Sequence, residues 1–167
     1  GRYKVANITH PEVRRMFIHY FRSTVRRYAD HPGFGGIEWW MNFGTWTGLD
    51  CGYDDYTVNA FARATGTRVP EKPQERYELL TKEPARSKWL KWRSEQVTEF
   101  IREMRDMLDE YNPALRLNLA IKQRADLYAE KGVDLAAIER VKDVTLVAER
   151  QPTSYRWHSF WGKPEPT

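Results

Sequence analysis

The sequence has few of the features that define disulfide-rich, metal-binding or membrane-spanning proteins. It holds one cysteine, Cys51, in 167 residues, which excludes an internal disulfide framework and leaves too few thiolates for a structural zinc site. Its apolar runs are only a few residues long, so no transmembrane helix and no membrane partner are predicted. The first residues, Gly-Arg-Tyr-Lys, carry no apolar signal region. These absences leave the cellular compartment open.

An excess of charge of one sign is also missing. There are 27 Lys and Arg against 23 Asp and Glu, for a net charge of +4, and the two signs alternate along the predicted helices. A dedicated nucleic-acid binder is expected to show a clustered basic face, so no nucleic-acid partner is predicted. Apolar residues make up 41% and charged residues 30% of the chain, which is typical of a folded globular domain. We expect residues 1–167 to form one domain or part of a larger one.

Helical and strand periodicities alternate along the chain. The first helix is expected to start in a capping box, Thr9–Glu12, and to run to Asp30; residues 43–53 are expected to form a long Gly-rich and aromatic loop. The further elements expected are a strand over Phe34–Met41, a helix from Asp54 or Asp55 to Thr65, a linker over Val69–Pro73, a helix over Pro84–Tyr111, a strand over Leu115–Ile121, helices over Arg124–Lys131 and Asp134–Val141, and a strand over Val144–Ala148.

This alternation predicts an α/β fold with a parallel sheet and covering helices. A complete (β/α)8 barrel takes about 250 residues and eight strands, whereas three strands are predicted here. We therefore expect part of a TIM-type barrel, or else a small open sheet. Missing strands would expose sheet edges and apolar faces, so self-association or contact with the remaining barrel segments is expected.

The ends of barrel strands and the loops after them form the active face of such folds. Glu38 lies within an apolar strand, where an ionised carboxylate is costly unless it is paired or functional. It is the candidate general acid, with a pKa raised by burial. The alternative is a structural Glu paired with an Arg from a neighbouring strand.

Aromatic residues near the same face suggest a carbohydrate site, because flat rings stack on sugars and their polar edges reach hydroxyl groups. Trp39 and Trp40 point to opposite sides of the strand by alternation, so at least one is structural. Trp46 and Tyr53, in the loop, are the better stacking candidates, with core packing as the alternative. The other candidate substrate contacts are Trp40, Asn42 and Asn118.

Carboxylates complete the list of candidates. Asp54 or Asp55 suits a helix N-cap better than catalysis, and Asp55 is kept as a substrate contact. Glu149 follows the third strand and either binds substrate or pairs with Arg150. His10, His19 and His31 match no zinc-ligand spacing, and His158 is a weak catalytic candidate. The sequence has no phosphate-binding or dinucleotide-binding glycine pattern, so neither a metal nor a cofactor is predicted.

Four segments carry a family resemblance: His31-Pro32, the strand Gly36–Asn42, the stretch Gly52–Gly66 and the helix around Trp89–Phe100. With them the chain resembles the middle of a clan A glycoside hydrolase, most closely the family 42 beta-galactosidases and related uncharacterised bacterial glycosidase-like barrels. The resemblance covers nearly the whole chain. It implies that the three predicted strands are barrel strands four, five and six.

The resemblance also implies an acid/base glutamate in an Asn-Glu pair at the end of strand four. Here Met41-Asn42 stands at that place, and Glu38 is the only carboxylate on the strand. The family's nucleophile glutamate ends strand seven, beyond these three strands.

The first hypothesis is thus a glycosidase-like barrel that hydrolyses O-glycosidic bonds with Glu38 as acid/base. The second is a carbohydrate-binding barrel without catalysis. The third is a basic α/β module that associates with nucleic acid through Arg14, Arg15, Arg26 and Arg27.

Overall fold

The computed structural model describes residues 6–41, 51–121 and 128–148. The described elements follow one another along the chain as listed here: α1 (Pro11–Tyr28), β1 (Gly36–Met41), α2 (Asp55–Thr65), α3 (Pro73–Leu80), α4 (Ala85–Asp109), β2 (Arg116–Ile121), α6 (Leu135–Glu139) and β3 (Val144–Ala148).

Helix α1 is confirmed, but its start differs from the predicted capping box. The N-cap is His10, whose ring Nδ1 accepts the backbone N–H of Glu12 at 3.2 Å. The Thr9 hydroxyl instead donates to the side-chain oxygen of Asn7 at 2.6 Å. The prediction was wrong because Thr9 is drawn into this contact, which leaves the capping role to the next residue.

The three strands form one parallel sheet in the order β1-β2-β3. Glu38 of β1 lies opposite Asn118 of β2, which in turn lies opposite Thr145 of β3. Gly36 has a φ of +138°, and a Cβ there would lie 2.0 Å from the carbonyl oxygen of Arg116. Glycine at this position therefore allows β1 and β2 to approach closely.

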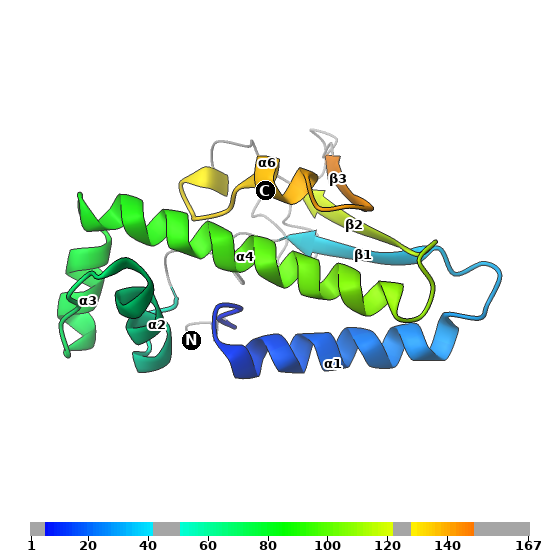
Figure 1. Ribbon diagram of the computed structural model, residues 1–167, viewed down its shortest axis with the longest axis horizontal. Coiled ribbons are helices and arrows are strands. Elements are labelled where there is room, and N and C mark those ends of the chain that lie inside the picture. Colours follow the sequence, from blue (N-terminus) through cyan, green and yellow to red (C-terminus); the bar gives the residue numbers. More distant parts are fainter. Residues whose placement is uncertain (1–5, 42–50, 122–127, 149–167) are drawn as a thin grey trace, which may run out of the picture.

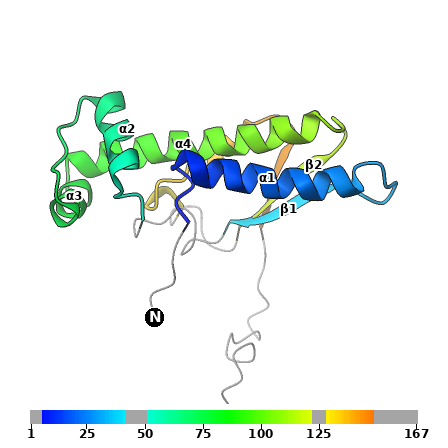
Figure 2. The same cartoon turned by 90° about the horizontal axis from the view of Figure 1, so that it is seen from below.

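Helices α1 and α4 lie side by side on one face of the sheet (Figures 1 and 2). Alternate residues of β1 point toward them, and Trp39 makes edge-to-face contacts with Phe21 of α1 and Phe100 of α4, with ring centroids 6.3 and 5.7 Å apart. Val133 and Ile138 bury their side chains in this same core. All the described covering segments therefore pack on one face, which we call the core face.

The predicted long helix is confirmed as α4, and its length has a structural reason. Its C-terminal half covers the sheet, while Trp89 and Trp92 in its N-terminal half pack with Phe61 of α2 and Leu80 of α3 in a second apolar cluster. The α2–α3 unit lies at the end of the molecule toward which the strands point (Figure 1). Helix α3 was not predicted, because only Arg76 and Leu80 of its residues are buried.

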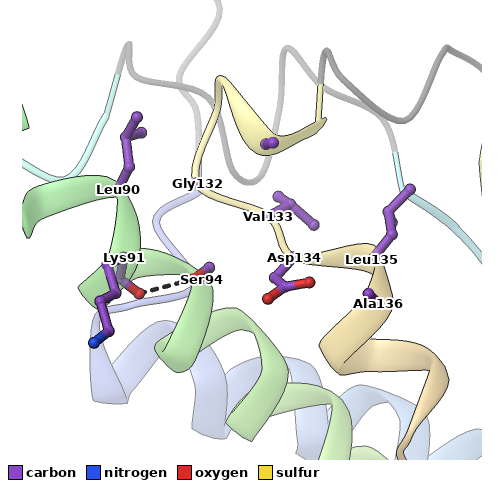
Figure 3. A pocket seen from close by; sticks show the side chains of 9 residues that line it. Leu90, Lys91, Ser94, Gly132, Val133, Asp134, Leu135 and Ala136 are labelled. Atoms are coloured by element: carbon purple, nitrogen blue, oxygen red, sulfur yellow. Dashed lines mark hydrogen bonds between the residues drawn. The ribbon is translucent and has the colours of Figure 1, made fainter. Parts of the chain in front are cut away.

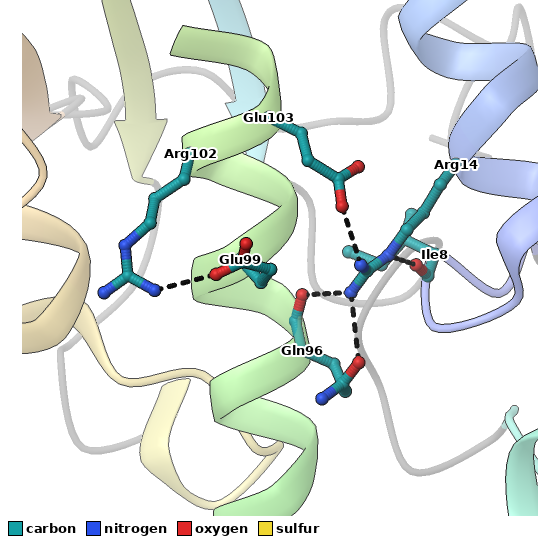
Figure 4. Close-up of polar contacts among 6 residues, drawn as sticks. All are labelled: Ile8, Arg14, Gln96, Glu99, Arg102 and Glu103. Carbon is teal, nitrogen blue, oxygen red and sulfur yellow. Dashed lines mark hydrogen bonds and ion pairs between the residues drawn. The ribbon is translucent and has the colours of Figure 1, made fainter. Parts of the chain in front are cut away.

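Arg14 joins α1 to α4 (Figure 4). Its guanidinium donates to the Ile8 carbonyl at 2.8 Å, pairs with Glu103 at 3.0 Å, and bonds to the backbone carbonyl of Gln96. Arg15, its neighbour, pairs with Glu12 at 2.8 Å. Arg27 lies over the ring of Tyr28, 5.6 Å from its centroid. Three of the four arginines considered for nucleic acid are therefore engaged within the chain.

The described residues thus form a mixed α/β fold with a small parallel sheet. The first half of the predicted helix over Arg124–Lys131 lies outside them, and in the second half Tyr128 and Ala129 are helical. Among the described helices, none combines the length and apolar character needed to cross a bilayer.

Candidate functional site

The second face of the sheet, which we call the open face, carries most of the predicted site residues that the structure describes. On each strand, the side chains at alternating positions point away from α1 and α4. The register of the three strands aligns these side chains in two rows that run across the sheet. One row is polar and the next, nearer the carboxyl ends, is apolar. The polar row is Glu38, Asn118 and Thr145, and the apolar row is Trp40, Ala120 and Val147.

Glu38 is solvent-exposed in this arrangement. The prediction that Glu38 is buried was wrong. Its sequence neighbours Ile37 and Trp39 point to the core face, and because side chains alternate along a strand, Glu38 points to the opposite face. Its in-register neighbour on β2 is Asn118, so the register does not place an arginine opposite it.

Glu38 is held by an aromatic partner on its own strand. The indole Nε1 of Trp40 donates to Glu38 Oε1 at 2.9 Å, a contact that same-face positions two residues apart allow. The side chain of Trp40 is 51% exposed, whereas that of Trp39 is 8% exposed. The predicted split of the two tryptophans is confirmed, with Trp39 as the structural one.

Asn118 stands in the middle of the polar row and is half-buried. Its amide can both donate and accept hydrogen bonds. The structure thus brings together three predicted residues, Glu38, Trp40 and Asn118, on neighbouring strands. The predicted contacts Asn42, Trp46 and Glu149 lie outside the described residues, as do Arg150 and His158.

Tyr53 lies in the second apolar cluster instead of on the sheet. Its ring packs against Tyr77 and Trp89, with centroids 5.3 and 6.1 Å apart, and it is half-buried. Burial raises the pKa of its phenol to about 12, against the opposing effect of the nearby Arg93. Tyr53 is therefore a neutral phenol at physiological pH.

The two aspartates at the start of α2 have separate structural roles. Asp54 is the N-cap and accepts the Thr57 backbone N–H at 2.9 Å, which confirms the capping interpretation. Burial would raise the pKa of Asp54, but hydrogen bonds from Thr57 and Asn7 outweigh it and hold the pKa below its usual range. Asp55 pairs with the buried Arg76 at 2.6 Å, and nothing in the described part of the chain brings it to the polar row.

Sequence reasoning missed a set of contacts around the start of α2. Asn7 donates to Asp54 at 2.8 Å and to Thr57 at 2.9 Å, and the rings of His10 and Tyr56 lie 5.0 Å apart. These residues are far apart in the sequence and show no spacing pattern, so only the fold could reveal them.

A hollow lies elsewhere among the described residues, between α4 and α6 (Figure 3). It measures about 530 Å³, and Leu90, Val133 and Leu135 supply apolar walls. Two polar side chains that line it form hydrogen bonds to nearby backbone groups: Ser94 donates to the Lys91 carbonyl at 2.8 Å, and Asp134 caps α6. No predicted site residue lines it.

The described residues contain no group of three His, Cys, Asp or Glu side chains placed to hold a metal ion. The chain matches no protein-family model, no curated protein and no solved structure.

Proposed function

We propose that this chain is part of a glycosidase-like (β/α)8 barrel that binds a carbohydrate and hydrolyses its O-glycosidic bond. The observation that carries the proposal is the polar row on the open face. It combines a carboxyl group, Glu38, with an amide, Asn118, beside the exposed indole of Trp40. A carboxyl group can transfer a proton, an amide can bind hydroxyl groups, and an indole can stack on a sugar ring.

The topology supports the barrel part of the proposal. Each new strand is added beside the preceding one, and the described covering segments all pack on one face. Doubly wound sheets reverse their strand order and carry helices on both faces, whereas barrels keep adding strands in one direction with helices outside. In a barrel the open face would be the interior, where parallel sheets need cover. Either remaining barrel segments or self-association would supply that cover.

Glu38 is assigned the acid/base role. A retaining glycosidase places two carboxyl groups about 5 to 5.5 Å apart, one as nucleophile and one as acid/base. The second group would come from another strand. The Trp40 indole orients the Glu38 carboxyl by its hydrogen bond and leaves the second oxygen available to the glycosidic oxygen.

The test is hydrolysis of a panel of nitrophenyl glycosides by the full-length protein. We expect Glu38→Gln to lower kcat by about 10² to 10⁴-fold for the accepted sugar, since turnover includes the step in which the same carboxylate acts as general base and this is the usual contribution of such a group. Glu139→Gln, which changes an exposed glutamate on α6, should retain full activity. Equal activity of Glu38→Gln and the wild type would contradict the catalytic assignment.

A carbohydrate-binding barrel without catalysis is the second candidate. It is favoured by Met41-Asn42, which stands where the resemblance implies an Asn-Glu pair. This candidate predicts that no glycoside is hydrolysed, while Asn118→Ala weakens sugar binding measured by calorimetry. Binding without turnover in the wild type would select it.

A further inference from the structure

Helix α1 carries the whole excess of positive charge of the chain. Between Pro11 and Tyr28 there are five arginines and one glutamate, and the resulting charge of +4 equals the net charge of all 167 residues. Removing them from the 27 basic and 23 acidic residues of the chain leaves 22 of each sign. The near balance of charge over the whole sequence therefore conceals one strongly basic element.

Two of the five arginines are neutralised against α4. Arg14 and Arg22 each pair with a glutamate, one within α4 and one at its C-cap. The other three face away from α4. Arg15 pairs with the glutamate one turn before it on α1, and Arg27 lies over the ring of its neighbour Tyr28. Neither Arg26 nor Arg27 has a carboxylate partner in the part of the chain that the structure describes.

The exposed side chains of α1 form two lines parallel to the helix axis, because residues three or four positions apart lie above one another on a helix. The side of the helix toward the sheet is occupied by the buried Phe21 and Val25. One exposed line is basic and the other is partly apolar. The basic line is Arg15, His19 and Arg26, and the second line is Met16, Tyr20, Ser23 and Arg27. We call these seven residues the α1 outer face.

Met16 and Tyr20 set this face apart from the rest of the surface. Their side chains are 58% and 64% exposed, the two highest values among the large apolar side chains of the described residues. Figure 1 shows α1 along the border of the molecule with α4 on its inner side. No described helix or strand therefore covers these two side chains.

Each feature alone has an ordinary explanation. Single exposed apolar side chains are common on protein surfaces, and arginines in the last turn of a helix interact favourably with its dipole. The dipole does not account for Arg15 and His19, which lie in the first half of α1. Nor does it account for two exposed apolar side chains one turn apart beside the basic line. Together the two lines have the spacing of a surface that contacts another helix.

The charge of the α1 outer face selects among the possible occupants. A second copy of this chain packed through the same face would place arginines near arginines, which opposes association. A single-stranded nucleic acid would pair with the arginines, but it would offer no apolar contact matched to Met16. A helix with apolar residues one turn apart, flanked by acidic residues, complements both lines.

We propose that the α1 outer face is the docking surface for an acidic amphipathic helix of a partner protein. Apolar side chains of that helix pack on Met16 and Tyr20, and its carboxylates pair with Arg26 and Arg27. The proposal is independent of the proposed function, because α1 lies on the core face of the sheet and Glu38 on the open face.

The test is the binding of fluorescent synthetic peptides to the full-length protein, followed by anisotropy. The first peptide is a helix with leucines at i, i+4, i+7 and i+11 and glutamates around them, and the second has the same composition in scrambled order. We expect the first to bind at least about tenfold more tightly, because only it presents an apolar line beside acidic residues. Added salt should weaken its binding, since exposed charges are screened.

Two substitutions separate the two lines. Tyr20→Ala and Arg26→Glu should each weaken binding of the first peptide about tenfold. Tyr77→Ala removes an exposed ring from α3, and Arg63→Glu reverses an exposed charge in the last turn of α2, as Arg26→Glu does in α1. Both control variants should bind like the wild type. Circular dichroism identifies any variant that fails to fold.

Equal binding of the two peptides, no binding of the first, or equal losses in the control variants would overturn the proposal. A single-stranded oligonucleotide or phosphatidylserine vesicles serve as competing probes. If either binds more tightly than the first peptide and loses affinity in Arg26→Glu, the α1 outer face recognises phosphate groups and the proposal of a helical partner is wrong.

Discussion

At the residue scale, Gly36 sets how closely β1 and β2 approach. Its positive φ and the Arg116 carbonyl, 2.0 Å from where a Cβ would lie, both oppose a side chain there. The adjacent Gly35 has no atom within 4 Å of the corresponding point. The predicted strand Phe34–Met41 includes both glycines, and only the pairing of the strands distinguishes them.

We expect Gly36→Ala to lower the free energy of unfolding by about 2 kcal/mol or more, because both backbone strain and a steric clash contribute. Gly35→Ala should change it by less than about 1 kcal/mol. Urea denaturation of the two variants beside the wild type checks this. Equal stability of the two variants would contradict the close approach of β1 and β2 at Gly36.

Glu38 shows where residue-level reasoning stops. Period-2 alternation placed Trp39 and Trp40 on opposite faces, and the structure confirms it. Alternation does not say which face is covered, since that depends on α1 and α4 packing from distant parts of the sequence. The expected burial of Glu38 failed for this reason, while its proximity to Asn118 follows from strand pairing.

At the element scale, helices with clear capping or amphipathic patterns in the sequence were predicted. Helix α3, which lacks such patterns, was not. Helix α2 begins after the N-cap Asp54 and ends at Gly66, which has a φ of +67°, and both signals stand in the sequence. Helix α3 starts at Pro73 after Lys72, which makes no side-chain capping hydrogen bond. Contacts of Arg76 with distant backbone hold it instead.

The cap of α2 makes a prediction about pH. The pKa of Asp54 is lower in the folded chain than its ordinary value of 3.8. Its carboxylate therefore stabilises the fold fully at pH values well above 3.8, and this contribution is lost as the pH falls through the folded pKa. We expect Asp54→Ala to cost about 0.5 to 2 kcal/mol at pH 7.

Because protonation removes the same interactions, the difference between Asp54→Ala and the wild type should shrink as the pH is lowered toward 2. Thermal unfolding across pH 2 to 7 measures it. A difference that stays constant over that range would contradict the role of the charged carboxylate.

At the scale of the whole molecule, α4 connects two apolar clusters. Phe100, Ile101 and Met104 belong to the cluster on the core face, and Trp89 and Trp92 belong to the cluster with α2 and α3. A continuous helix shared in this way should couple the unfolding of both clusters. The amphipathic pattern predicted the length of α4, but not that its two halves serve different cores.

We expect Phe61→Ala, in the second cluster, to destabilise the chain by about 3 to 5 kcal/mol. Unfolding followed by tryptophan fluorescence and by far-UV circular dichroism should still give one coincident transition, since α4 spans both clusters. Separate transitions in the variant would show that the α2–α3 unit unfolds independently of the sheet.

The central proposal is that Glu38 acts as the acid/base of a sugar site. The most direct measurement is the effect of Glu38→Gln on two glycosides of the same accepted sugar in the full-length protein, one with a nitrophenolate leaving group and one with an alkoxide. A general acid matters most when the leaving group is basic. We predict a loss in kcat/KM at least about tenfold larger for the alkyl glycoside than for the nitrophenyl glycoside. An equal loss on both substrates, or none, would contradict it.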